Sequence, residues 1–255
     1  MMRTLRVLYH QVGFDLLIFR RNPASTFFTI VFPLIFLFVF VGVFGNQELT
    51  NGTPVANVYV AGLLALQIVS ATTMNLAITT TMRREGGMLK RVRGTPLAPW
   101  VFLMAQAVGA FVIALAAAIL MNLAGWLVFG VNVVPETLVS LGITILIGSA
   151  SFSMLGLALS IIIPSQNAAP AIANAILLPL YFISGVFIPD EQIPGWISDL
   201  AGFFPIKHLA SALFESYDPF ASGMPWPATE WLVIATWGLF AAALVLRFFR
   251  WNPRS

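Results

Sequence analysis

Nucleophilic catalysis in this chain would have to start from the serines of its apolar stretches, such as Ser149, Ser151 and Ser153. A serine becomes a nucleophile when a base beside it accepts its proton. Both histidines, His10 and His208, lie outside the long apolar stretches, and no lysine shares the stretch that holds these serines. We therefore interpret the serines as small residues at helix contacts and predict no catalytic residue.

The chain also lacks the residues that metal binding and nucleotide binding need. The chain has no cysteine, which removes disulfides, thiolate ligands and cysteine nucleophiles. No group of His, Asp and Glu has the spacing of metal ligands, and we predict no metal site. The phosphate-binding pattern GxxxxGK[ST] is absent, so the chain cannot hold ATP in that way. We therefore expect no cofactor bound by this chain.

The composition is that of an integral membrane protein. Of the 255 residues, 59% are hydrophobic and only 9% are charged, whereas a soluble domain carries about 25% charged residues. So few charges cannot cover a surface that faces water. The same numbers exclude disordered, fibrous and nucleic-acid-binding proteins, and we expect no nucleic-acid partner.

Uncharged stretches divide the chain into helices that can cross a membrane, which takes about 20 apolar residues each. The longest stretch, from Glu136 to Asp190, has room for two helices, and Pro164 with the polar residues after it separates them. We predict one all-α transmembrane domain, residues 1–255, with six spans at about 26–45, 58–81, 100–129, 137–163, 168–188 and 229–248.

The charges predict which ends of these spans face the cytoplasm, because basic residues concentrate there. Twelve of the 13 basic residues precede the first span, lie at or beyond the end of the last, or lie between the second and third. Only Lys207 falls on the other side, where eight of the ten acidic residues lie. We predict that both termini and the loop 82–97 are cytoplasmic.

Residues 1–22 form a predicted helix in the inner membrane interface. Apolar residues recur there at helical spacing, and most of the charges lie off that stripe, Asp15 included. The alternative is an ordinary leader before the first span. The stripe consists of Leu5, Leu8, Val12, Leu16 and Phe19.

The interiors of the six predicted spans contain no ionisable acid, base or histidine. This argues against a proton-coupled carrier and against a channel with a charged ring. Polar side chains do occur there, and they either bond helix to helix or line a translocation path. The candidates for the path are Gln67, Thr72, Asn75, Asn174 and Tyr181. The phenylalanines of the first span likewise either contact substrate or face lipid.

The loop 82–97 combines basic residues with apolar ones at helical spacing, namely Met88, Leu89 and Val92. Glycines flank this segment, and we predict a short amphipathic helix that docks on a cytoplasmic partner. The alternative is a basic loop that only sets the topology.

On the other side, Pro179 and Gly185 interrupt the fifth span, and residues 189–228 are too apolar for a free loop and too interrupted to span. We predict re-entrant or interfacial helices there.

Two motifs resemble those of the permease subunits of type-2 ABC exporters, the group that contains daunorubicin-type drug permeases and related lipid and polysaccharide exporters. The family pattern R-E-x-G-x-L-x-R-L-R-x-T-P-L matches Arg84, Glu85, Gly86, Leu89, Arg91, Arg93, Thr95, Pro96 and Leu97. The pattern P-L-x-F-x-S-G-x-F-x-P, followed by P-x-W, matches Pro179, Leu180, Phe182, Ser184, Gly185, Phe187, Pro189, Pro194 and Trp196. Two departures are Glu215, where the family often has arginine, and Gly87, which replaces a frequent threonine.

The resemblance implies a permease without enzymatic activity in the cytoplasmic membrane of a bacterium. Two copies of a separate ATPase subunit would bind ATP and magnesium, and a second permease, identical or homologous, would complete the exporter. A hydrophobic or amphipathic drug or lipid would pass between the two permeases, along spans two and five. The alternative is a stand-alone carrier, channel or scaffold in the membrane, with no ATPase.

The resemblance also implies roles for individual residues. The residues that couple to the ATPase would be Arg84, Glu85, Gly86, Met88, Leu89, Arg91 and Arg93. An external gate would consist of Phe182, Gly185, Phe187 and Pro189.

Overall fold

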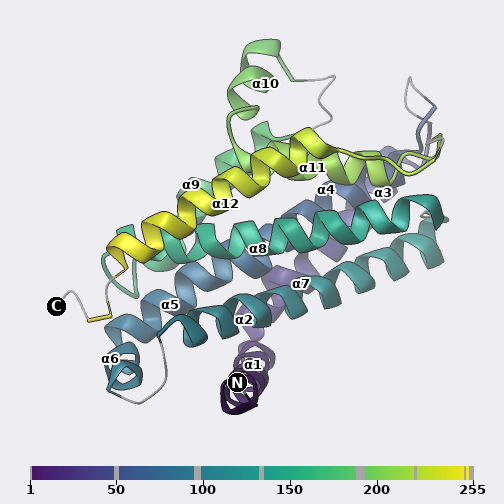
Figure 1. Ribbon diagram of the computed structural model, residues 1–255. Coiled ribbons are helices and arrows are strands. Elements are labelled where there is room, and N and C mark those ends of the chain that lie inside the picture. Colours follow the sequence, from purple (N-terminus) through teal and green to yellow (C-terminus); the bar gives the residue numbers. More distant parts are fainter. Residues whose placement is uncertain are drawn as a thin grey trace.

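The protein is a bundle of long helices that lie side by side, with one further helix across them (Figure 1). No strand occurs in the described part of the chain, which confirms the all-α prediction. The computed structural model describes residues 2–48, 52–94, 99–131, 135–187, 193–220, 223–249 and 251–252.

The first span is built from α2 (Pro23–Thr26), a π-helical segment η1 (Phe27–Val31) and α3 (Phe32–Phe44). It starts where Asn22 accepts a hydrogen bond from the backbone N–H of Ser25, as an N-cap residue does. Only 22% of its most apolar segment of 18 residues is buried, so most of this helix faces outward.

The second span lies at the centre of the bundle. It runs without a break through α4 (Val55–Val69), the π-helical segment η2 (Ser70–Met74) and α5 (Asn75–Glu85). In its most apolar segment of 18 residues 89% is buried, a larger share than in any other described span. Small residues permit this packing: a Cβ atom at Gly62 would lie 2.5 Å from the carbonyl oxygen of Val186.

Three more helices match predicted spans. They are α7 (Pro99–Phe129), α8 (Leu138–Ile162), which follows the 3-10 turn η3 (Pro135–Thr137), and α12 (Ala228–Phe248). At four of the six ends the observed helix differs from the prediction by one residue, and at the other two ends it agrees. Helices α8 and α12 approach closely where Gly238 lies against Ser151, as small residues allow in membrane proteins.

The predicted fifth span is shorter in the structure than in the prediction. Helix α9 (Ala169–Ile183) has 15 residues, and at 1.5 Å per residue it extends about 22 Å, against about 30 Å for a bilayer core. The chain turns at Gly185, whose φ is 81°. Five described helices are long and apolar enough to span, so the predicted count of six is not confirmed.

Two short helices follow this turn, in the region where re-entrant or interfacial helices were predicted. Helix α10 (Gly195–Ala201) stands away from the bundle beside α9, whereas α11 (Pro205–Ser216) buries one face against α4, α8 and α12 (Figure 1). Residues 188–192 and 221–222, which belong to the same predicted region, lie outside the described residues.

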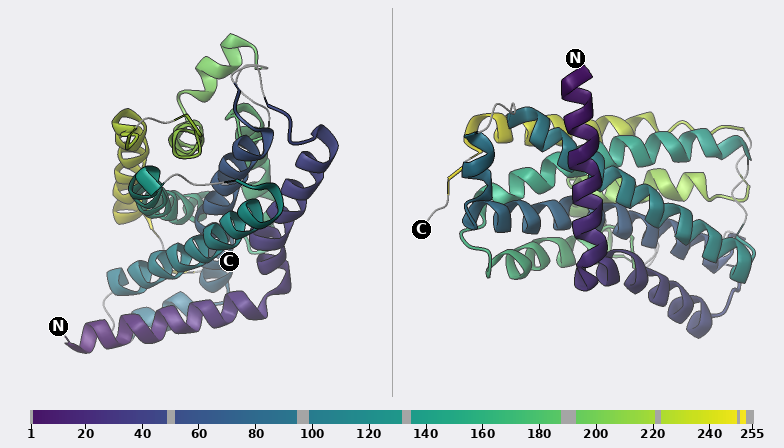
Figure 2. Two further views of the ribbon diagram at one scale, coloured as in Figure 1. Left: turned by 90° about the vertical axis from the view of Figure 1, so that its right-hand side faces the viewer. Right: turned by 90° about the horizontal axis from the view of Figure 1, so that it is seen from below.

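Helix α1 (Met2–Arg21) crosses the long helices and packs mainly on α7 (Figure 2). Val12, Leu16 and Phe19 of the predicted stripe are half-buried. The expectation that Asp15 lies off the packed face is wrong, because its carboxylate turns toward the bundle and pairs with Arg83. Side chains of residues 1–7, with Leu5, lie outside the description.

Candidate functional site

The loop after the second span is a tight turn that leads into the short helix α6 (Met88–Arg93). The backbone N–H of Gly86 donates to the carbonyl of Met82 at 2.9 Å, which closes the end of α5. Gly87 has a φ of 71°, a left-handed conformation that glycine adopts without strain. The side chain of Leu89 is fully buried and anchors α6. A short helix after glycines is what the sequence predicted; we call this end of the bundle the α6 end.

Arg84, at the C-terminal end of α5, points into the protein and is 1% exposed. Its two terminal nitrogens donate to the carbonyl oxygens of Ser160 and Ile163, each at 2.7 Å, and its Nε donates to Glu85 at 2.8 Å. Ser160 belongs to the last turn of α8 and Ile163 is its C-cap residue, so neither carbonyl has a donor within the helix. Arg84 therefore caps α8 and ties it to the second span.

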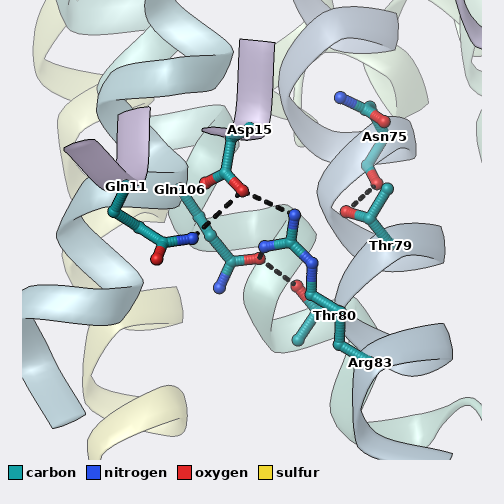
Figure 3. A network of polar contacts seen from close by, with 7 residues as sticks. All are labelled: Gln11, Asp15, Asn75, Thr79, Thr80, Arg83 and Gln106. Atoms are coloured by element: carbon teal, nitrogen blue, oxygen red, sulfur yellow. Dashed lines mark hydrogen bonds and ion pairs between the residues drawn. The ribbon is translucent and has the colours of Figure 1, made fainter. Parts of the chain in front are cut away.

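Arg83, the preceding residue, points the other way, toward α1 and α7 (Figure 3). It donates to Asp15 Oδ1 at 2.6 Å and to Gln106 Oε1 at 3.0 Å, and Thr80 donates to the same Gln106 oxygen. The side chains of Arg83 and Asp15 are each 10% exposed. Burial raises the pKa of Asp15 above its usual value, and the Arg83 guanidinium opposes that shift. Consecutive arginines thus fix the second span to three other helices.

Sequence reasoning did not identify Asp15, Arg83 or Gln106 as functional residues. The available signal was Asp15, which is the one acid among the basic residues that precede the first span. An isolated acid on a helix that faces a basic loop is a candidate for an ion pair, but its partner depends on how α1 crosses the bundle.

The surface of the loop is formed by other residues. Gly86, Lys90 and Arg91 are exposed, and Met88 is half-buried. The carboxylate of Glu85 is bonded to Arg84. Among the predicted coupling residues, the structure therefore places Gly86 and Arg91 at the surface and Arg84 and Leu89 inside. The side chain of Arg93 lies outside the description.

Two of the predicted path residues are buried in the second span. Thr72 donates to the carbonyl of Ile68 in its own helix at 2.6 Å. Gln67 is fully buried, and neither amide atom has a hydrogen-bond partner among the described groups. The hydroxyl of Tyr181 lies 3.5 Å from that of Ser70, and so joins α9 to η2.

The two predicted asparagines lie in different surroundings. Asn75 is half-buried and lines a cavity with Asp15 and Arg83. Asn174 donates to the carbonyl of Pro170, one turn earlier in α9, at 2.9 Å. The contacts of these side chains do not unite the five residues in one site, and their role in a path stays a prediction.

Aromatic rings surround the turn that was predicted as an external gate. The ring of Phe187 lies 5.1 Å from that of Phe182 and 5.9 Å from that of Phe36, between ring centres. Phe182 is exposed, Phe187 is half-buried, and Gly185 makes the turn. Pro189 lies outside the described residues. The rings connect α9 to the first span at the end of the bundle opposite α6.

The family can be assigned from the sequence as a whole. Residues 12–217 match the model of the family described as ABC-2 type transporter. The chain belongs to that family. It is similar to the putative transport permease YvfS of Bacillus subtilis, with 24% identity over 195 residues, which cover 76% of this chain and 79% of YvfS.

Two further relatives of this ABC-2 type permease cover similar lengths. The daunorubicin resistance ABC transporter permease protein DrrB1 of Streptomyces coeruleorubidus is 25% identical over 204 residues, 77% of this chain and 70% of DrrB1. The putative transport permease ycf38 of Pyropia yezoensis is 24% identical over 221 residues, 86% of this chain and 75% of ycf38. The resemblance found in the two motifs is therefore confirmed, and the chain is a multi-pass membrane permease.

Proposed function

We propose that this chain is the permease subunit of an ATP-driven exporter and that a separate ABC ATPase supplies the energy. The observation that carries the proposal is the match of residues 12–217 to the ABC-2 type transporter family. The sequence supports it in two ways. It lacks a GxxxxGK[ST] loop, and the interiors of its predicted spans contain no ionisable acid, base or histidine. Energy would then have to enter from outside the chain, as ATP and magnesium on the partner.

In this proposal the ATPase docks on the α6 end. Lys90 and Arg91 are exposed there on a helix whose opposite side is anchored by buried Leu89. Arg84 and Glu85 would act from inside, because Arg84 joins the loop to the last turn of α8. A displacement of α6 by the ATPase would in this way move the second span and α8 together. Two ATPases and two permeases, identical or homologous, would form the exporter.

The substrate in this proposal is a hydrophobic or amphipathic small molecule, a drug or a lipid, that passes between the two permeases. The name of DrrB1 refers to daunorubicin resistance, and that of YbhR of Escherichia coli, 26% identical over 189 residues, to a probable multidrug transporter. The interiors of the predicted spans offer no charged group to a polar substrate. The proposed location is the cytoplasmic membrane of a bacterium.

The test is co-purification of the tagged chain from its native membranes in mild detergent, with ATPase activity and protein stoichiometry measured. We expect a soluble ATPase in a one-to-one ratio and a band for the second permease if that permease differs. The matched variant is Lys90→Glu/Arg91→Glu, which reverses two exposed charges of α6. A pure chain without ATPase, after gentle extraction and cross-linking, would favour a stand-alone carrier, channel or scaffold instead.

A further inference from the structure

A small polar cavity lies between α1, α5 and α7. Its volume is about 30 Å³, and a water molecule needs roughly 10–15 Å³ measured in this way, so there is room for about two. Polar side chains from all three helices line it together with Gly109 and a few apolar residues. Among the lining residues are Asp15, Asn75, Thr79, Arg83 and Gln106.

Two buried polar atoms of the lining residues have no hydrogen-bond partner among the described groups, Asp15 Oδ2 and Gln106 Nε2. The orientation of the Gln106 amide is fixed, because its oxygen accepts from both Arg83 and Thr80. One acceptor and one donor therefore remain beside the cavity. Water satisfies both kinds of atom, and a buried polar group without a partner is costly.

The same network holds a helix whose apolar side chains are only partly buried. Among the described side chains of α1, none is fully buried. Leu16 and Phe19 pack against the core but are only partly buried. The charge-assisted bond between Asp15 and Arg83, at 2.6 Å, adds a directed contact to this partial apolar packing. Arg83 also lies next to Arg84, which caps α8.

We propose that this cavity is a site for ordered water and that the water, Asp15, Arg83 and Gln106 form a latch that holds α1 on α5 and α7. The latch joins α1 to the helix that leads into α6. Only its part in transport rests on the proposed function, because the latch itself is a property of the single chain.

A single cysteine tests the latch on the purified full-length chain. The chain has no cysteine of its own, and a Cβ atom at buried Gly109 would lie 3.5 Å from that of Asp15, an ordinary contact distance. In a Gly109→Cys background, α1 covers the thiol, and we expect a water-soluble maleimide to react slowly. Asp15→Leu or Arg83→Met leaves the other charge buried without its partner and should raise the rate about tenfold or more.

The double variant Asp15→Leu/Arg83→Met should return the rate to within about threefold of the background, because two apolar side chains replace a buried ion pair at little cost. Arg20→Met removes an exposed charge of the same helix and is the control, with no change expected. If both single variants label like the background, the latch is wrong. Should they fail to fold, Asp15→Asn, the mildest change, must still label faster than the background, and an equal rate overturns the proposal.

Hydroxyl-radical footprinting tests the water, because radicals formed from ordered water modify the side chains beside it. Leu76 lines the cavity and is 4% exposed, whereas Leu66 in the same span is 5% exposed and is not among the lining residues. We expect Leu76 to be modified faster than Leu66, and equal rates would exclude ordered water in the cavity. Neither experiment needs the ATPase, so failure of co-purification would contradict the proposed function and leave the latch standing.

Discussion

The two ends of the second span are held by different kinds of contact. At the α6 end, Arg83 and Arg84 direct charge-assisted hydrogen bonds to α1, α7 and α8. At the opposite end, Gly62 lies against the backbone of Val186, aromatic rings surround Phe187, and the hydrogen bond from Asn57 to the Tyr217 carbonyl carries no charge. Charge-assisted hydrogen bonds fix direction and register, whereas ring contacts tolerate small shifts. The comparison indicates that buried charge specifies the partners of the second span at the α6 end, whereas close backbone packing and ring contacts specify them at the opposite end.

The largest effect should come from Arg84→Met. It would leave the carbonyls of Ser160 and Ile163 and the carboxylate of Glu85 without their common donor. Breaking a buried charged network costs about 3–5 kcal/mol, and we expect a large fall in the Tm of the detergent-solubilised chain. Arg247→Met, at an exposed position of α12, is the control. A Tm equal to that of the control would mean that α8 does not need this cap.

The corresponding change at the opposite end is Gly62→Ala. A methyl group there meets the Val186 carbonyl oxygen at 2.5 Å, and backbone must shift to admit it. Overpacking of this kind costs about 1–3 kcal/mol. Gly42→Ala in α3, with no atom within 4 Å of the new Cβ, should leave the Tm unchanged or raise it slightly. Equal thermal stability of the two variants would show that the turn after α9 is not held against α4.

A smaller loss is expected from Phe187→Leu. The substitution keeps an apolar side chain but removes the ring contacts with Phe36 and Phe182, which are worth about 0.5–1.5 kcal/mol in comparable pairs. The control is Phe182→Leu, because Phe182 is exposed and should matter less to the monomer. The measurement is the Tm of both variants. A lower Tm for Phe182→Leu than for Phe187→Leu would contradict the central place of Phe187 in these ring contacts.

Lys90→Glu/Arg91→Glu separates surface charge from buried charge at the α6 end. Both side chains are exposed, and the free energy of unfolding should change by no more than about 0.5 kcal/mol. Co-purification with the ATPase should nevertheless be lost, because the reversal changes the charge of the proposed docking surface. A large fall in Tm would show instead that these side chains support the fold.

The smallest effect should come from Glu215→Gln, at the opposite end. Burial raises the pKa of Glu215, and the negative charge of Glu230 raises it further. The folded state therefore binds this proton more tightly than the unfolded state, and stability falls as the pH rises from the ordinary pKa of 4.5 through the raised one. Glu215→Gln should raise the Tm slightly at neutral pH and have no effect well below pH 4.5. A gain that persists at low pH would exclude this origin.

The sequence alone determined the class of protein, the bounds of three of the six predicted helices to within one residue, and the short helix after the second span. These follow from local properties. A helix across the membrane needs an uninterrupted apolar segment, and charges and glycines at its ends show where it stops. The two motifs around Arg84 and Gly185 also sufficed for the family. The fifth span was the exception, because apolarity continues past Ile183 while the backbone turns.

Only the tertiary structure decided which residues meet. Arg83 and Arg84 are consecutive arginines in the last turn of α5, yet one bonds to α1 and α7 and the other caps α8. Asp15 was expected off the packed face and is bonded inside, because α1 crosses the bundle where Arg83 can reach it. Hydropathy shows which stretches of the sequence are apolar and which face of a helix is apolar. It does not show which other helix packs against that face. The choice of partner depends on how helices distant in the sequence pack, and that is set by the whole bundle.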